Sequence, residues 1–197
     1  TEYKPFDLYK VSADIPGEIK DYYPPGSSSE APLPIIYNTS GGALYFGNRN
    51  FDKPNGGIIV RNLHLLGNGD GVGIFFYNGF TDAVFDNVII DGFSVGFSLG
   101  GGSRLSNNIT IKNSQISNNH LQGILGGANN LSLINNQFVN NGFGGAKESF
   151  LYHNIYLSDP SATLEPIQQI KNVKIINNYL TQSAMDNGKC GGASLAI

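Results

Sequence analysis

The sequence has little cysteine, little charge and no long apolar run. Its single cysteine, Cys190, excludes an internal disulfide. Charged residues make up only 14% of the chain, which excludes a coiled coil or a solvent-exposed helical bundle. The net charge is −3, and nucleic-acid binding needs clustered Lys and Arg, so no nucleic-acid partner is expected. No apolar run approaches the roughly 20 residues that span a bilayer.

What the sequence does contain is glycine, with 26 residues, and asparagine, which is frequent from about position 106 onward. The first part of the chain differs in composition from the rest. The run Pro24-Pro25-Gly26-Ser27-Ser28-Ser29 indicates a loop, and further prolines keep the following stretch extended. We therefore expect residues 1–55 to form an irregular entry or cap segment and residues 56–197 to form the main domain.

Residues 56–197 contain a repeat centred on an asparagine. Apolar residues stand four and two places before it, which is the period-2 pattern of a strand with one buried face. A further apolar residue follows three places after it. The five asparagines, which are 25, 26, 22 and 42 residues apart, are Asn62, Asn87, Asn113, Asn135 and Asn177.

A second block of the repeat has the pattern Gly-apolar-x-apolar and predicts a further strand. It begins at Gly73, Gly96, Gly123 and Gly192, and Asn154 takes the place of the glycine in the remaining turn. Short strands and turns within 22–26 residues are typical of one turn of a β-solenoid. The sequence therefore predicts an all-β fold, a right-handed parallel β-helix of about five turns.

The repeated asparagine has a physical role in such a stack. Its side-chain amide can bond the same group in the adjacent turn, and its backbone tolerates the left-handed conformation of a tight corner. We expect the five asparagines to form a structural ladder. A leucine-rich repeat is the nearest alternative fold, but it leaves room for a helix in every turn. An ordinary β-sandwich with Asn-rich turns is the other alternative.

Three motifs resemble those of the pectate-lyase-like superfamily of right-handed parallel β-helices: Asn108-Ile-Thr-Ile-Lys-Asn113, Asn130-Leu-Ser-Leu-Ile-Asn135 and Asn172-Val-Lys-Ile-Ile-Asn177. The resemblance covers roughly residues 56–197. The stretches 152–157 and 187–192 also look like ones in bacterial β-helix proteins that lack an assigned substrate. The resemblance implies a polysaccharide partner, bound in a groove formed by the strand at Asn154 and the loop before it.

The turn that contains Asn154 is longer than the others. The distance from the ladder asparagine to the next block is 9–11 residues in the first three turns and 19 before Asn154, while 23 residues separate Asn154 from the next ladder asparagine. Long loops on a rigid scaffold often carry function. From this turn we take the candidate catalytic residues Lys147, His153 and Tyr156, and the candidate substrate-binding residues Glu148, Tyr152 and Asn154.

Alternation within residues 154–157 predicts that Ile155 and Leu157 point inward while Asn154 and Tyr156 point outward. A Lys or His base with a Tyr acid suits β-elimination of an acidic, uronate-containing polysaccharide. We therefore expect lyase chemistry ahead of glycoside hydrolysis, which needs a pair of carboxylates that the sequence does not make evident. The alternative for His153 is a structural role at the start of a strand.

No cofactor or metal site is expected from a specific motif. Asp70 lies in the stretch Gly67-Asn68-Gly69-Asp70-Gly71, which is similar to a calcium loop. The alternating acids and the later bidentate Glu of an EF-hand are missing, so we expect a turn there. A Ca²⁺ ion remains an option only as part of the lyase chemistry.

A non-catalytic solenoid that binds carbohydrate, or that forms a fibre or a surface structure, is the alternative function. The aromatic residues Phe75, Tyr77, Phe80 and Tyr156 could line one long side of the stack and contact the faces of sugar rings. Phe75 therefore joins the candidate substrate-binding residues. Arg104 joins them as a contact for an acidic polymer.

The last residues, 193–197, form an apolar, strand-like block without the polar cap that the end of a solenoid needs. We therefore expect either that the β-helix continues in a longer chain or that the protein associates end to end with itself. A bacterial protein that acts on polysaccharide is expected to be secreted, periplasmic or on the cell surface.

Overall fold

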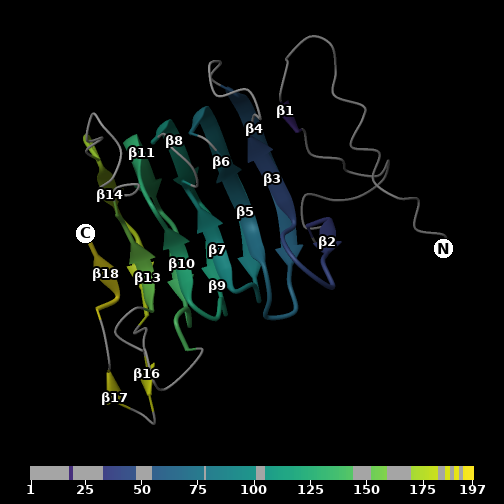
Figure 1. Cartoon of the computed structure of the whole chain (residues 1–197), viewed down its shortest axis with the longest axis vertical. Coiled ribbons are helices and arrows are strands. Elements are labelled where there is room, and N and C mark those ends of the chain that lie inside the picture. Colours follow the sequence, from purple (N-terminus) through teal and green to yellow (C-terminus); the bar gives the residue numbers. More distant parts are fainter. Residues whose placement is uncertain are drawn as a thin grey trace, which may run out of the picture.

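The computed structural model describes residues 33–47, 55–77, 79–100, 105–143, 152–158, 170–181 and 193–197, and the backbone of residues 18–19, 185–186 and 189–190. Within these ranges the chain forms strands and turns and no helix. Figure 1 shows the strands stacked side by side, in sequence order across most of the molecule. A leucine-rich repeat with a helix in each turn is therefore excluded for this part of the chain.

Ten strands form a parallel sheet that bends at the repeated asparagines; we call it sheet A. Its strands are β1 (Glu18–Ile19), β2 (Ile35–Tyr37), β4 (Asn55–Leu66), β6 (Phe80–Asp91), β8 (Ser106–Lys112), β9 (Gln115–Ser117), β11 (Ala128–Ile134), β12 (Gln137–Val139), β14 (Lys174–Ile176) and β15 (Tyr179–Leu180).

Six strands form a second parallel sheet, sheet B, in the order β18-β13-β10-β7-β5-β3. Their bounds are β3 (Leu44–Gly47), β5 (Val72–Tyr77), β7 (Val95–Ser98), β10 (Gln122–Leu125), β13 (His153–Tyr156) and β18 (Leu195–Ala196). The short antiparallel pair of β16 (Met185–Asp186) and β17 (Lys189–Cys190) stands apart from both sheets.

The chain alternates between the two sheets, and each pass pairs in parallel with the pass before it. This arrangement is a parallel β-solenoid of about four turns, which confirms the predicted all-β solenoid. The five asparagine motifs all lie on sheet A, and four circuits of the chain separate the first motif from the last. The right hand of the helix and the count of five turns stay predictions.

The core lies between the sheets and is built from the predicted alternation. On sheet A the residues two places before the first four ladder asparagines pair in register and are fully buried: Val60, Phe85, Ile111 and Leu133. Phe85 meets Phe97 of sheet B edge to face, with ring centroids 5.1 Å apart. Burying each side chain of this size contributes roughly 1.5–3 kcal/mol.

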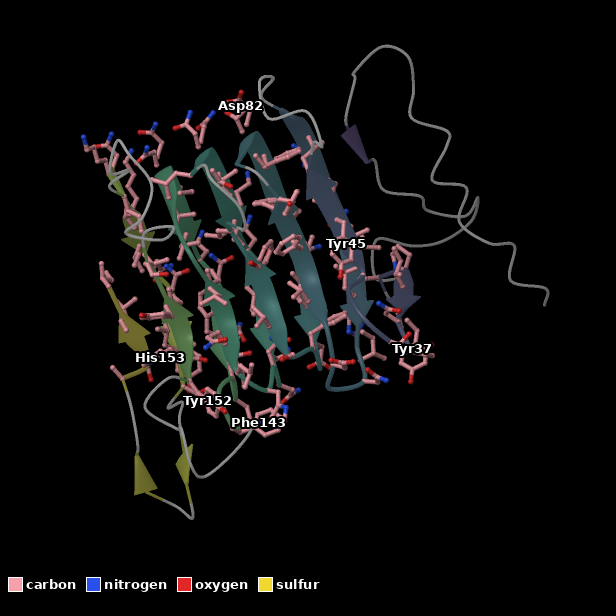
Figure 2. The ribbon with its side chains drawn as sticks, viewed as in Figure 1. Tyr37, Tyr45, Asp82, Phe143, Tyr152 and His153 are labelled. Atoms are coloured by element: carbon pink, nitrogen blue, oxygen red, sulfur yellow. The ribbon has the colours of Figure 1, made fainter. Side chains whose placement is uncertain are left out.

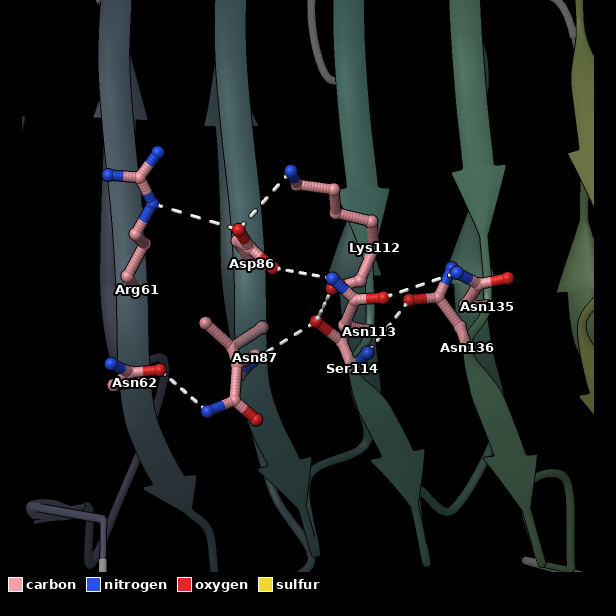
Figure 3. Close-up of polar contacts among 10 residues, drawn as sticks. Arg61, Asn62, Asp86, Asn87, Lys112, Asn113, Ser114, Asn135 and Asn136 are labelled. Atoms are coloured by element: carbon pink, nitrogen blue, oxygen red, sulfur yellow. Dashed lines mark hydrogen bonds and ion pairs between the residues drawn. The ribbon is translucent and has the colours of Figure 1, made fainter. Parts of the chain in front are cut away.

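The ladder asparagines occupy the bend of sheet A with left-handed backbone, at φ between 51° and 55°. Figure 3 shows the side-chain bonds among Asn62, Asn87, Asn113 and Asn135. Asn87 donates to Asn62 (2.6 Å), Asn135 donates to Asn113 (3.3 Å), and Asn177 donates to Asn135 (2.9 Å). The predicted ladder is therefore confirmed at these three steps.

The ladder departs from the prediction at its second step, between Asn87 and Asn113. Asn113 donates to the carboxylate of Asp86 (2.8 Å) instead of to Asn87. Asp86 lies on the outer face of β6 and also pairs with Lys112 Nζ at 3.3 Å and Arg61 Nε at 3.7 Å (Figure 3). A carboxylate accepts only, so it satisfies all three donors where a second amide would satisfy one.

Asparagine also fills positions inside the solenoid, which the repeat pattern did not predict. At the corner that leads from sheet A into sheet B, Asn119 and Asn141 are buried and their amides stack on one another. Asn141 Oδ1 accepts from Asn119 Nδ2 at 2.8 Å, and Asn141 Nδ2 donates to the Ile116 carbonyl at 2.9 Å. These amides satisfy buried backbone groups that a corner would otherwise leave without partners.

Candidate functional site

The outer face of sheet B carries two of the candidate residues, Phe75 and Tyr156. Strand pairing places one outward residue of each strand in a single row, which crosses the sheet from β3 to β18: Tyr45, Phe75, Ser98, Leu125, Tyr156 and Ala196. The residues before and after Phe75, Ser98 and Tyr156 point into the core, where they are buried. We call this series the outer row of sheet B.

Aromatic rings gather at the first end of this row. Tyr45 is 63% exposed, and its ring meets that of Phe75 edge to face with centroids 5.6 Å apart. Phe75 is half-buried, and its ring lies 6.1 Å from that of Tyr77, which is 43% exposed. We call Tyr45, Phe75 and Tyr77 the aromatic platform. Three rings on two adjacent strands thus offer a continuous apolar surface with two phenol hydroxyls.

His153 and Tyr156 lie toward the other end of the sheet, on β13 (Figure 2 labels Tyr45 and His153). Their ring centroids are 5.2 Å apart and the rings are inclined by 31°. His153 is only 5% exposed, and its Nδ1 lies 2.5 Å from the Ala193 carbonyl oxygen. Because a carbonyl oxygen only accepts, Nδ1 carries the ring proton and Nε2 keeps the basic lone pair.

The structure corrects the prediction for Asn154. Ile155 and Leu157 point inward as predicted, but Asn154 does so too and is 0% exposed. Its Oδ1 accepts from Asn141 Nδ2 at 2.8 Å, and its own amide donates to the Thr181 carbonyl. An inward side chain bonded on both sides is a structural element, so the assignment of Asn154 as an outward substrate contact is wrong.

The reason lies in the corner that precedes each strand of sheet B. The glycines that hold this position in other turns have no room for a side chain: a Cβ on Gly123 would come within 3.1 Å of Asn141 Nδ2, and one on Gly96 within 2.8 Å of Ile116. The position therefore faces the interior, against the strict alternation of a flat strand. Asn154 fits because its amide takes part in the buried amide stack.

The remaining candidates divide between described and undescribed parts of the chain. Lys147, Glu148 and Arg104 lie outside the described residues, so their predicted roles stay predictions. Tyr152, just before β13, is partly exposed.

A further prediction concerned Phe80, which was placed on the exposed side of the stack. Phe80 is buried, since its ring stacks on Phe76 at 5.1 Å and lies 5.5 Å from Phe46. It belongs to the core and not to a binding surface. Tyr45, which sequence reasoning missed, takes part in the platform instead. The signal was weak because Tyr45 precedes the first recognisable repeat.

Charge divides the two sheets. The outer face of sheet A carries the ion-paired group Arg61, Asp86 and Lys112 in register on three neighbouring strands. The strands of sheet B contain no Lys, Arg, Asp or Glu. Their outer row therefore carries no charged side chain, and the buried His153 is the one histidine on these strands.

Among the residues whose side chains are described, no three His, Cys, Asp or Glu side chains come together as a metal-binding group would require. In the same part of the chain, no helix has the length and apolar character that crossing a membrane demands.

Comparison with protein family models, with curated proteins and with solved structures finds no match for this chain. The parallel β-solenoid is therefore assigned from the pairing of its strands. The resemblance to the pectate-lyase-like superfamily rests on the three asparagine motifs, whose residues are structural: they form the bends and ladders of sheet A.

Proposed function

We propose that the protein binds a polysaccharide along the outer face of sheet B. The observation that carries this proposal is the outer row itself, which begins with the exposed Tyr45 and the half-buried Phe75 and reaches Tyr156 in strict register. Parallel strands are about 4.8 Å apart, so the four steps from Tyr45 to Tyr156 extend over roughly 19 Å. A row of that length suits an extended chain of sugars better than a single small molecule.

The chemistry of the row supports the same ligand class. Aromatic rings have flat apolar faces, and tyrosine adds a polar tip that donates or accepts a hydrogen bond. A sugar ring has complementary features, with an apolar face of C–H groups and a rim of hydroxyls. Ser98 and Leu125 lie between the two aromatic ends, and their side chains are smaller than the aromatic rings. The rigid solenoid holds these groups in place before the ligand arrives.

The proposal is tested by binding measurements against a panel of soluble polysaccharides by affinity electrophoresis or calorimetry. Tyr45→Ala and Tyr156→Ala are expected to weaken binding of whichever polysaccharide is retained. Tyr179→Ala is the matched control, because Tyr179 is 61% exposed but lies on β15 of sheet A. Binding that is equally weakened by all three substitutions, or by Tyr179→Ala alone, would overturn the assignment to sheet B.

Cleavage of an acidic polysaccharide by β-elimination is a second candidate function, favoured by the contact of His153 Nδ1 with the Ala193 carbonyl oxygen. With Nδ1 engaged by the Ala193 carbonyl, Nε2 is the atom able to take the proton beside a uronate carboxylate. The electron pair of that C–H bond forms the new double bond, and the glycosidic C–O bond breaks. Tyr156, in contact with His153, would then protonate the leaving oxygen. Lys147 is the proposed third group.

The lyase proposal has a direct assay, because each elimination creates an unsaturated uronate that absorbs in the ultraviolet. Pectate, alginate and glycosaminoglycans are the substrates to use. His153→Ala and Tyr156→Phe are expected to abolish the new absorbance while Tyr179→Ala leaves it unchanged. Product formation that persists in both site variants would contradict the assignment of these roles.

Two proposals accompany this function. A protein that meets polysaccharide is proposed to act outside the cytoplasm, as a secreted, periplasmic or surface protein. End-to-end self-association is proposed through β14 and β18, each of which pairs with a single neighbouring strand in the described part of the chain. Analytical ultracentrifugation over a range of concentrations tests the association, and a monomer at every concentration would contradict it.

A further inference from the structure

We propose that the aromatic platform of Tyr45, Phe75 and Tyr77 is a subsite for a neutral pyranose unit, separate from the His153–Tyr156 end of sheet B. The inference rests on the proposed polysaccharide-binding function and adds the class of sugar that this part of the face takes. The platform lies on β3 and β5, and β7 and β10 separate it from β13. A ligand unit on the platform therefore occupies a different part of the row from one beside Tyr156.

Two glycines lie close to the exposed tyrosines of the platform. A Cβ at Gly42 would come within 2.6 Å of Tyr45 Cζ, so the bare backbone at this position is what allows the ring to lie where it does. A Cβ at Gly47 would come within 2.7 Å of Tyr77 Cβ. Neither glycine has the left-handed backbone that would otherwise account for its presence. Gly42 thus leaves room for the Tyr45 ring, and Gly47 lets the backbone of β3 lie close to that of β5 at Tyr77.

Exposure makes these rings unlike the aromatic residues of the core. Phe46 and Phe76, which alternate with them on the same strands, point inward and pack against Phe85. Tyr45 and Tyr77 gain only part of that burial, although a large exposed aromatic surface is unfavourable in water. A ligand that covers the rings would remove this cost, and the flat C–H face of a pyranose matches a surface built of ring faces and edges.

The absence of charge determines the class of sugar. The strands of sheet B carry no Lys or Arg that would pair with a uronate carboxylate. The platform therefore suits neutral units, with the Tyr45 and Tyr77 hydroxyls available for their hydroxyl groups.

The experiment is calorimetric titration of the full chain with neutral hexasaccharides of glucose, mannose and xylose, and with oligogalacturonate of the same length. Binding of at least one neutral oligosaccharide is expected. Tyr45→Ala and Tyr77→Ala are each expected to weaken that binding about tenfold, as loss of a central aromatic contact does. Tyr179→Ala, on sheet A, is expected to leave it unchanged. Because the substituted side chains are exposed, circular dichroism should show the same folded state in all variants.

A second variant tests the seating of the ring without removing it. Gly42→Ala pushes the Tyr45 ring from its place and is expected to weaken neutral-sugar binding while Tyr45 itself remains. Binding of oligogalacturonate but of no neutral oligosaccharide would overturn the inference and leave the proposed function standing. Binding of neither class would overturn both. Neutral-sugar binding that is unaffected by Tyr45→Ala and Tyr77→Ala would place the sugar elsewhere and also refute the platform.

Discussion

At the scale of single residues, asparagine does two different jobs in this solenoid. At the exposed bends it supplies the left-handed backbone, as at Asn113 with φ of 51°. In the interior it supplies a buried amide that bonds backbone groups and the next amide in the stack, as Asn141 does. The two roles have different physical bases, conformational in the first case and polar in the second, and substitutions separate them.

Asn141→Ala is expected to lower the free energy of unfolding by about 1–3 kcal/mol, because it leaves buried polar groups without partners. The groups concerned are Asn119 Nδ2, the Ile116 carbonyl and Asn154 Oδ1. Urea denaturation measures the change. Asn107→Ala is the control, since Asn107 is exposed and accepts a single bond from Asn130. Equal losses in the two variants would contradict the role assigned to the buried stack.

Asn113→Ala and Asn113→Gly both remove the ladder amide, so the difference between them isolates the backbone conformation. Glycine adopts a positive φ without strain, whereas alanine at φ of 51° costs roughly 1–2 kcal/mol. The alanine variant is therefore expected to be the less stable by about that amount in the same urea experiment. A glycine variant as unstable as the alanine variant, or less stable, would show that the bend does not depend on the left-handed conformation.

At the scale of elements, the alternation of apolar residues predicted the strands of sheet A well and the start of each strand of sheet B poorly. Phe85 and Ile111 pair in register and point inward, as the period-2 pattern predicts. The alternation holds there because the strands of sheet A are extended on both sides of their one bend. At the corner before sheet B the chain turns within two residues, and consecutive residues such as Asn154 and Ile155 both face inward. The glycines at this corner indicated close packing in the sequence. They did not indicate that the position points into the core.

Gly96, at this corner, and Gly100, beyond the end of β7, give a matched pair of glycine substitutions. Gly96→Ala is expected to destabilise the protein, because its Cβ would lie 2.6 Å from the Gly123 carbonyl oxygen and 2.8 Å from Ile116. Gly100→Ala meets no atom closer than 4.0 Å among the contacts of its Cβ and is expected to change stability little. Overpacking of this kind costs about 1–3 kcal/mol. Thermal unfolding of both variants measures the contrast, and a Gly96→Ala protein as stable as Gly100→Ala would refute the packing argument.

At the scale of the whole molecule, the fold could be predicted because every turn repeats the same constraint: an apolar pair, a left-handed asparagine and a further apolar residue. Each turn contacts only its neighbours, so the pattern of one turn describes the others. The site could be predicted only in part, because it combines positions from different turns. The sequence identified Phe75, Tyr77 and Tyr156, but Tyr45 joins them through the pairing of β3 with β5, which sequence spacing alone does not reveal.

The charge distribution is also a property of the whole molecule. Ion pairs are found on the outer face of sheet A, where Asp86 bridges Arg61 and Lys112, while the strands of sheet B lack charge. A net charge of −3 therefore says little about the ligand. The two faces of one solenoid present different surfaces, and the aromatic one is the better candidate for a sugar polymer.

The central claim, that the outer face of sheet B binds polysaccharide, is tested most directly by mapping a bound oligosaccharide with nuclear magnetic resonance on isotope-labelled protein. The account predicts that backbone amide signals shift along the outer row of sheet B, at Tyr45, Phe75, Ser98, Leu125 and Tyr156. The signals of Arg61, Lys112 and Tyr179 on sheet A should stay in place. Shifts confined to sheet A, with sheet B unchanged at saturating ligand, would contradict the account.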